Sequence, residues 1–473
     1  MKLSLLSTSV VLATALIGGC TLGPDYRVPT TVEPSALRYD QGWQPMPEQS
    51  WAASGRWWEV FGDAELNALI EEANHRNQTL AQAEARYRAA LAQRRLSTGE
   101  YSPTLSAALD TARSGGSEVS TETRSSAQLG ISWELDLWGR VRRQVESDTA
   151  ALEASAADLA AARLSIQSAV INSYINLRAQ DLQYRLLEQT LASSARSAQL
   201  TGNQYDAGIV SRADVIQAET QLQSLRSDLY DLQNQWALEQ NTIAALLGRA
   251  PIDLQLEVVE ALPAVPPIPA QLPAELIARR PDVVSAERGV AAANADIGVA
   301  ITAWLPTLTL GGSAGVSGGS ISDLWDTPVR VWSVGPSLAQ TLFDGGRRSA
   351  ARDAALARYD EQVAAYRQTV LDALADVENA LATTAILREK AVQQDRLVAL
   401  AEENERVITN RYQSGLVSYL EVSVAQNTTL SAKRGRISVT SAQLAAATEL
   451  ASAIGGGWQV GDDVGDAGVR SAE

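Results

Sequence analysis

The chain has 473 residues, a formal net charge of −16 at pH 7 and only 5% aromatic residues. The acidic charge argues against nucleic-acid binding, which needs a basic surface, and the low aromatic content argues against a large aromatic core. One cysteine (Cys20) and one histidine (His75) exclude an internal disulfide framework and a zinc site built from Cys and His.

The first 20 residues are typical of an exported lipoprotein. An apolar run from Leu3 to Ile17 is too short to span a membrane and suits a signal peptide. It ends in Ile17-Gly18-Gly19-Cys20, which resembles the bacterial lipobox, where cleavage before the cysteine precedes lipidation. We therefore predict a signal peptide over 1–19 and a lipidated N-terminal segment over 20–62, with Cys20 as the N-palmitoyl and S-diacylglycerol cysteine. The alternative is a buried free cysteine.

The remainder is a tandem duplication. Tyr205–Ser211 matches Tyr412–Ser418, and Gly139-Arg140 matches Gly346-Arg347, both at an offset of 207 residues. Ser102–Leu105 matches Leu305–Leu308 at an offset of 203. These landmarks predict a first repeat over 63–250, a proline-rich linker over 251–272, a second repeat over 273–455 and a tail over 456–473.

Each repeat is expected to begin with a helix, about 63–98 and about 273–301, in which His75 is an exposed residue without a catalytic partner. Two strands follow, about 103–112 and 127–137 in the first repeat and about 305–316 and 329–343 in the second. In 127–137, apolar Leu129, Ile131, Trp133 and Leu135 alternate with polar residues, the period-two pattern of a strand. Pro336 is tolerable at a sheet edge, and the Gly-Ser-rich segments 114–117 and 311–320 are expected to be loops.

Long helices follow the strands. Apolar residues recur every seven positions in 145–191, 215–243, 356–377 and 430–451, which indicates packed, supercoiled helices. The stretch 141–203 contains no proline, and as one helix it would be roughly 95 Å long. Such a helix suits a span or a tube better than a compact domain.

The four strands have the length that crosses a bilayer, yet an open four-stranded sheet leaves backbone groups unpaired in lipid. One chain cannot close a barrel, because such barrels start at about eight strands. Three copies would supply twelve, with the Leu129 row facing lipid and the Gln128 row facing water. The alternative is a small soluble sheet packed on the helices.

Several motifs, in order, resemble one family. They are Gly23–Pro29, Trp57–Asp63, Arg279–Val283, Asn294–Ala300, Leu342–Arg347 and the two Tyr-x-x-Gly loops. Together the chain resembles the outer membrane factors, the TolC-like efflux channels, and specifically their NodT-type lipoprotein branch. The resemblance implies a mainly α, internally duplicated homotrimer with a twelve-stranded transmembrane β-barrel, a long periplasmic α-helical barrel and an equatorial domain. It also implies outer-membrane lipid, a periplasmic adaptor and an inner-membrane pump of the RND class as partners.

The resemblance places the two hairpin loops at the periplasmic tip, where Tyr205, Gly208 and Ser211, with Tyr412, Gly415 and Ser418, would dock the adaptor. The glycines can take positive φ in a tight reversal, and each serine can cap the next helix. Two ordinary helix-joining turns are the alternative. The second loop carries no acidic residue from Gly415 to Tyr419, so Leu416 and Val417 are expected to form an apolar gate that closes by dewetting.

The strand-to-helix junctions are expected at Gly139 and Arg140 and at Gly345, Gly346 and Arg347. A positive charge at a helix start is unfavourable. Arg140 and Arg347 are therefore expected to pair with nearby acids such as Asp136 or Asp344, or with lipid headgroups, or else to be solvated charges.

Other functions are weighed against this one. A coiled-coil lipoprotein without a pore would explain the lipobox and the heptads, but not the alternating strands or the duplication. A channel for protein secretion would share the architecture. An enzyme is disfavoured, because the sequence has no nucleophile elbow, Gly-rich phosphate loop or metal-ligand cluster. No cofactor and no metal are expected.

Overall fold

The computed structural model describes residues 21–31, 55–117, 119–266 and 279–458. Cys20, the signal peptide, most of the N-terminal segment and the end of the tail lie outside these ranges. The chain divides into two compact units. Unit 1 comprises Met1–Thr31, Ala85–Ala156 and Val284–Thr369, and unit 2 comprises Val32–Glu84, Ala157–Val283 and Val370–Glu473.

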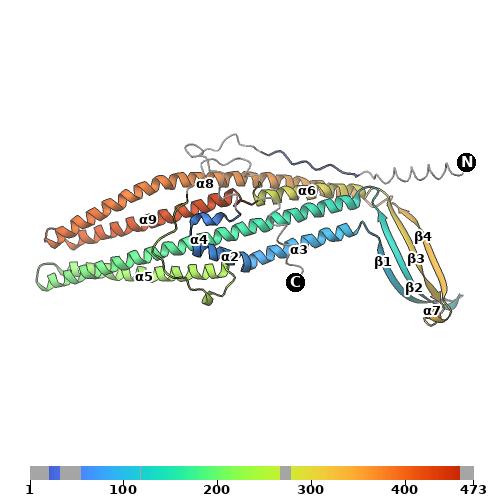
Figure 1. Cartoon of the computed structure of the whole chain (residues 1–473), viewed down its shortest axis with the longest axis horizontal. Helices are drawn as coiled ribbons and strands as arrows, with labels where there is room; N and C mark the ends of the chain where they lie inside the picture. Colours follow the sequence, from blue (N-terminus) through green and yellow to red (C-terminus); the bar gives the residue numbers. More distant parts are fainter. Residues whose placement is uncertain (1–20, 32–54, 118, 267–278, 459–473) are drawn as a thin grey trace. The chain divides into compact units, whose positions relative to one another are not determined.

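Unit 1 holds one antiparallel sheet of four strands in the order β1-β2-β3-β4 (Figure 1). The strands are β1 (Thr104–Gly116), β2 (Val119–Leu135), β3 (Thr307–Gly318) and β4 (Val329–Ala339), with the short helix α7 (Asp323–Asp326) between the last two. Each repeat contributes one hairpin, and the β2–β3 pairing joins them. Pro336 lies in β4, which is an edge strand of this four-stranded sheet, as predicted.

The register brings the apolar residues of all four strands onto one face. Leu105 lies opposite Ile131, Ile131 opposite Gly312, and Gly312 opposite Val334. Most large side chains of this face are exposed: Leu105, Leu109, Leu129, Ile131, Leu310, Trp332, Val334 and Leu338. A soluble sheet packed on helices would bury this face, so the alternative of a sheet covered by its own helices is wrong for the described residues.

Two helices of 67 residues each, α4 (Arg140–Asp206) and α8 (Arg347–Gln413), have residues in both units. The predicted helix over 141–203 is therefore confirmed. Unit 1 also contains α6 (Pro281–Thr302) from Val284 onward and α3 (Gln78–Gly99) from Ala85 onward. No helix in the described ranges is both long enough and apolar enough to cross a membrane.

Unit 2 contains two helical hairpins, α4–α5 and α8–α9, drawn in green and in orange to red in Figure 1. Here α5 is Arg212–Leu246 and α9 is Tyr419–Ala453, and the two contact each other along their lengths. On α5 the buried Ala218, Leu225 and Leu232 are spaced by seven, which is the packing stripe of a supercoiled pair.

A hydrophobic core lies beside these hairpins in unit 2. It gathers η2 (Trp57–Phe61), α2 (Ala64–Arg76), the middle of α4, the end of α5 and the end of α9. Trp57 and Trp58 are only 1% and 3% exposed. After η3 (Pro251–Asp253), Leu254 and Leu256 of the predicted linker also enter this core, so the linker's first residues pack rather than only connect.

Several element boundaries differ from the prediction. The first helix is broken at Asn77, whose Oδ1 accepts from the N–H groups of Thr79 and Leu80 while its Nδ2 donates to the carbonyl of Leu246. Asn77 thus caps α3, and its bond to a distant residue fixes the break. The second-repeat helix begins at Pro281, since proline suits the first turn of a helix.

The strands also differ. The expected loops 114–117 and 311–320 are mostly strand, since β1 runs to Gly116 and β3 to Gly318. Small residues are needed in β3, because a Cβ on Gly315 would clash with the carbonyl of Ala127. The Ser-Thr-rich stretch 119–126 joins β2 by pairing with β1. Finally, β4 ends at Ala339, opposite the first residue of β3, so 340–343 have no neighbouring strand within the chain.

Candidate functional site

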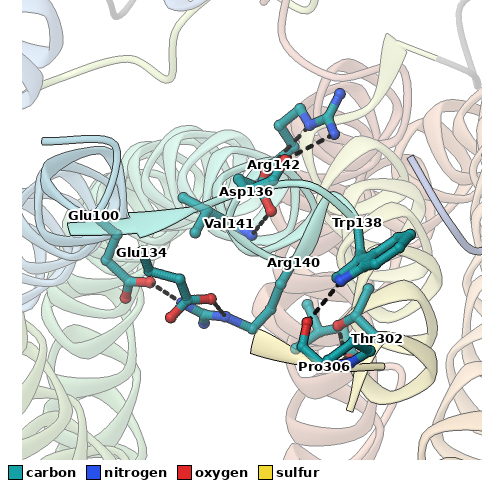
Figure 2. A network of polar contacts seen from close by, with 10 residues as sticks. Glu100, Glu134, Asp136, Trp138, Arg140, Val141, Arg142, Thr302 and Pro306 are labelled. Carbon is teal, nitrogen blue, oxygen red and sulfur yellow. Dashed lines mark hydrogen bonds and ion pairs between the residues drawn. The ribbon is translucent and has the colours of Figure 1, made fainter. Parts of the chain in front are cut away.

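The first strand-to-helix junction is held by Asp136, just after β2. Its carboxylate accepts from the backbone N–H groups of Val141 (3.1 Å) and Arg142 (3.0 Å) and pairs with the Arg142 guanidinium at 3.1 Å (Figure 2). These bonds satisfy free donors at the start of α4. Gly139 has φ of 82°, a conformation that glycine adopts without strain. The chain can therefore turn sharply from strand into helix.

Arg140 lies between the carboxylates of Glu134 and Glu100, each at 2.8 Å, in Figure 2. The hydrogen bond that Arg140 donates to Glu134, together with the second carboxylate, raises the pKa of Arg140 despite its partial burial. Glu100 follows the end of α3 and Glu134 is in β2, so the guanidinium fastens these two segments to the start of α4. The prediction that Arg140 pairs with a nearby acid is confirmed, but its partners are Glu134 and Glu100, because Asp136 pairs with Arg142.

The second junction repeats this arrangement with Asp344. The Asp344 carboxylate accepts from the N–H groups of Gly346 and Arg348, both at 3.0 Å, and pairs with Arg348 at 2.8 Å. Gly345 and Gly346 have φ of 67° and 89°. Arg347 is exposed, which agrees with the alternative of a solvated charge, and Asp344 pairs with Arg348 instead. The useful signal was an aspartate before each helix start with an arginine in its first turn.

The peptide 21–31 docks against unit 1 beside the first junction. Arg143, whose side chain is 4% exposed, donates to the carbonyls of Leu22 (3.0 Å) and Gly23 (3.3 Å). Asn294 donates to the carbonyl of Pro24 at 3.0 Å. A Cβ on Gly23 would lie 2.6 Å from the Cα of Gly298, so only glycine permits this approach. The role of Arg143 was missed, because nothing in the local sequence distinguishes it from Arg142.

The docked peptide continues to Tyr26, whose hydroxyl donates to the Glu287 carboxylate. Burial and this hydrogen bond raise the pKa of Tyr26, so the phenol keeps its proton at physiological pH. Arg288 lies over the ring, 5.8 Å from its centroid, and pairs with Glu287. Two family-like motifs, Gly23–Pro29 and the α6 segment, are thus in direct contact.

The first hairpin tip joins α4 to α5. Gly208 has φ of 73°, and the N–H groups of Gly208 and Ile209 donate to the carbonyls of Tyr205 and Gln204, which closes the end of α4. Ser211 caps α5 and forms a capping box with Asp214, as predicted for the serine. Tyr205 (41%) and Ile209 (69%) are exposed. This tip therefore presents apolar side chains on a rigid turn.

The second tip, between α8 and α9, has the same turn but different side-chain placement. Gly415 has φ of 73°. Ser418 occupies the N-cap without a capping bond from its side chain, so the prediction that its side chain caps the helix is wrong. Leu416 is 69% exposed, while Val417 packs against a cluster of Tyr412, Tyr419, Val422 and Ala218. The two residues expected to act together at a gate thus point to different environments.

Tyr412 differs from its repeat equivalent Tyr205. It is 5% exposed, and its hydroxyl lies 2.8 Å from Thr201 Oγ1 and donates to Gln204 Oε1 at 2.8 Å. Its ring meets Tyr419 edge-to-face at 5.8 Å. Tyr412 therefore ties the second tip to α4 and is almost fully buried, while its docking role stays a prediction.

Unit 2 also contains a buried ionic network that sequence reasoning missed. Arg178 (1% exposed) pairs with Asp181 (0%) at 2.8 Å and with Glu65 at 2.6 Å, and donates to the carbonyl of Glu257. Asp181 also accepts from Trp236 Nε1 at 2.9 Å. The network links α2, α4, α5 and the segment after η3. Among the described residues, no group of His, Cys, Asp and Glu side chains could hold a metal ion.

Comparison with known proteins gives consistent matches. The family model described as "Outer membrane efflux protein" matches residues 69–249 and again 272–456. The toluene efflux pump outer membrane protein TtgC of Pseudomonas putida is 31% identical over 470 residues, covering 97% of this chain and 96% of that protein. Nodulation protein T of Rhizobium leguminosarum is 31% identical, covering 92% of each chain.

The solved structure of the outer-membrane channel OprN superposes with a TM-score of 0.85 at 32% identity, covering 93% of this chain and all of that one. The two matches to one family model fall on the two halves of the duplication. The resemblance read from the motifs is therefore confirmed over nearly the whole chain.

Proposed function

This chain belongs to the outer membrane efflux protein family, and from that membership we infer that it is the outer-membrane channel component of an efflux system. It is a transport protein of the bacterial outer membrane that extends into the periplasm. We propose that it conducts passively and catalyses no reaction, and that its cargo is small molecules supplied by an inner-membrane pump through a periplasmic adaptor.

The observation that carries this proposal is the sheet. Its apolar face is exposed, its four strands have 11 to 17 residues, and both β1 and β4 have a free edge. Strands of about 9–11 residues cross a bilayer when tilted, but every backbone group must then be paired. Three copies would join twelve strands into a closed wall with the apolar face toward lipid. A pore-free coiled-coil lipoprotein would leave this face unexplained.

For docking, we propose that the adaptor contacts the exposed residues of the two tips. These are Tyr205 and Ile209 at the first tip and Leu416 and Leu420 at the second, all more than a third exposed. Gly208 and Gly415 shape the turns, and Ser211 and Ser418 begin the next helices. Tyr412 is proposed as a brace for the second tip rather than a contact residue.

For gating, we propose that Leu416 forms an apolar constriction when three second tips meet, while Val417 anchors that tip to the cluster around Tyr412. An apolar ring excludes water without needing a cation. For anchoring, we propose that Cys20 carries lipid and that the docked peptide from Thr21 onward holds the anchor near the first junction. The Cα of Thr21 would lie only 3.0 Å from a Cβ on Gly139.

The test is reconstitution. Purified full-length protein, solubilised from outer membranes, should behave as a trimer by light scattering and should give discrete ion conductance in planar bilayers. Deletion of the gene should sensitise the host to small toxic compounds, with rescue by the intact gene. A monomer, or a trimer that conducts no ions under any voltage, would contradict the proposal.

A further inference from the structure

The sheet has two unpaired edges, and the duplication specifies how they meet. Within one chain β1 and β4 each have a neighbour on one side only. Successive strands run antiparallel, so β4 of one copy can continue the sheet onto β1 of a second copy in the same sense. This step rests on the proposed function, because it assumes that copies share one wall. The open question is which residues face each other.

The two hairpins are the same unit in the same register. Thr104 pairs with Ser132 in the first repeat, and Thr307 pairs with Ala339 in the second. Adding 203 to the residue number in the first strand and 207 to the number in the second strand converts the first pair into the second. The same two offsets convert the pair Leu109–Ala127 into the observed pair Gly312–Val334. The repeat therefore conserves strand pairing residue by residue.

The junction between repeats inside the chain is a template for the junction between copies. There β2 of the first repeat pairs with β3 of the second: Leu135 with Leu308, and Ser132 with Gly311. Adding 207 to a residue number of β2 gives its equivalent in β4, and subtracting 203 from a residue number of β3 gives its equivalent in β1. We propose that β4 pairs with β1 of a second copy in the register Ala339 to Ala108, Leu338 to Leu109 and Leu342 to Leu105 of the partner subunit.

The faces of the strands agree with this register. Leu338 belongs to the exposed apolar face, and so does Leu109, which the register places opposite it. A shift of one residue would set Leu338 against Ala108 or Asp110 and turn the apolar row of one copy toward the polar row of the next. The proposed seam continues both faces without interruption.

The end of β4 agrees with the same register. In the first repeat β2 runs three residues beyond its pairing with β1, and these residues, Trp133 to Leu135, pair with β3 alone. Their equivalents are Gln340 to Leu342, which follow the end of β4, and Leu342 is 87% exposed. In the seam they would lie opposite Leu105 to Ala107 of the partner subunit. We therefore expect β4 to lengthen by three residues on assembly.

Disulfide trapping tests the register. Ala108 and Ala339 are exposed, small and on the polar face, so the double variant Ala108→Cys with Ala339→Cys should fold. Directly opposed residues have Cα atoms about 4.5–5.5 Å apart, within disulfide range. Within one chain the two strands are separated by two others, roughly 14 Å at about 4.8 Å per strand, so any bond formed must join copies.

The matched controls keep Ala339→Cys and move the second cysteine by two residues, to Ser106→Cys or Asp110→Cys. Diagonal neighbours lie about 7–8 Å apart, beyond ordinary disulfide reach. Outer membranes would be oxidised mildly and run on non-reducing gels, with the parent chain and both single variants as background. The opposed pair should give covalent dimers and trimers about tenfold more readily than either shifted pair.

A second opposed pair, Leu109→Cys with Leu338→Cys, tests the other face. Efficient trapping of a shifted pair instead of the opposed one would overturn the register while leaving the trimer intact. Absence of trapping in all pairs, with a trimer still seen by light scattering, would overturn strand pairing as the seam. Absence of a trimer in the parent chain would instead refute the proposed function from which the inference starts.

Discussion

Replacing Tyr412 with phenylalanine removes one hydroxyl from the brace between the second tip and α4. That hydroxyl lies 2.8 Å from Thr201 Oγ1 and 2.8 Å from Gln204 Oε1. A tyrosine hydroxyl has one proton, which the geometry assigns to Gln204. Thr201 can donate to Tyr412 only when it leaves the carbonyl of Ser197, which it also contacts at 2.9 Å. The loss is therefore one full hydrogen bond and one shared bond.

The magnitude follows from this count. A net hydrogen bond contributes about 1 ± 0.5 kcal/mol, so the brace is worth about 1–2 kcal/mol per tip. If three equivalent, distant tips act together, the sum is roughly 3–6 kcal/mol. Because about 1.4 kcal/mol corresponds to a tenfold change in an equilibrium constant, Tyr412→Phe should raise the ratio of open to closed tips by about 10²- to 10⁴-fold.

Planar-bilayer recordings of wild type and Tyr412→Phe would measure open probability at matched voltage and salt. Tyr205→Phe is the control, because Tyr205 holds the same place in the first repeat but is exposed. It should leave the recordings unchanged. If Tyr412→Phe conducts like wild type while both proteins remain trimeric, the bonds to α4 do not restrain the second tip, and the reasoning fails.

Three further variants probe other parts of the chain. Leu416→Asp should raise leak conductance, because a charged ring wets an apolar constriction; unchanged conductance would remove Leu416 from the gate. Asp181→Ala removes the most buried carboxylate that pairs with Arg178, so it should lower the free energy of unfolding by about 3–5 kcal/mol, measured as a lower thermal midpoint. A loss below about 1 kcal/mol would show that Glu65 and water compensate. Gly298→Ala places a Cβ 2.8 Å from Arg143 Cγ and 3.0 Å from the carbonyl of Leu22, so it should loosen the docked peptide and accelerate tryptic cleavage after Arg27. The control Gly202→Ala, where a Cβ meets open space, should leave the cleavage rate unchanged.

Much of the fold is predictable because the spacing of apolar residues along the sequence indicates the secondary structure. Heptad spacing gives the long helices, and alternation gives the central strands, since both patterns report which face of an element is buried or lipid-facing. The open sheet follows from counting: four strands cannot satisfy their own edges in lipid. The duplication supports these predictions, because each motif occurs at equivalent positions in both repeats.

The errors occur where a distant contact decides a local structure. Asn77 breaks a helix that periodicity continues, because its side chain is held by the carbonyl of Leu246, 169 residues away in sequence. The Gly-Ser-rich segment 311–320 predicts a loop, yet Gly315 is required for the close approach of β3 to β2. Arg143 looks like its neighbours until the docked peptide is present. No window of local sequence contains these partners.

The candidate site also shows where duplication misleads. The tips have equivalent turns, with Gly208 and Gly415 at the same φ, and from sequence Tyr205 and Tyr412 receive the same role. The two repeats also contact each other, however, and these contacts are not symmetric, so equivalent positions face different neighbours. Thr201 and Gln204 stand in front of Tyr412, whereas Tyr205 meets Arg212 of its own hairpin at 5.8 Å. The two hairpins keep the same strand register because this backbone pairing lies within each hairpin. The tip contacts differ because they join one repeat to the other. A duplicated channel can therefore brace one set of tips and leave the other exposed for a partner without changing either turn.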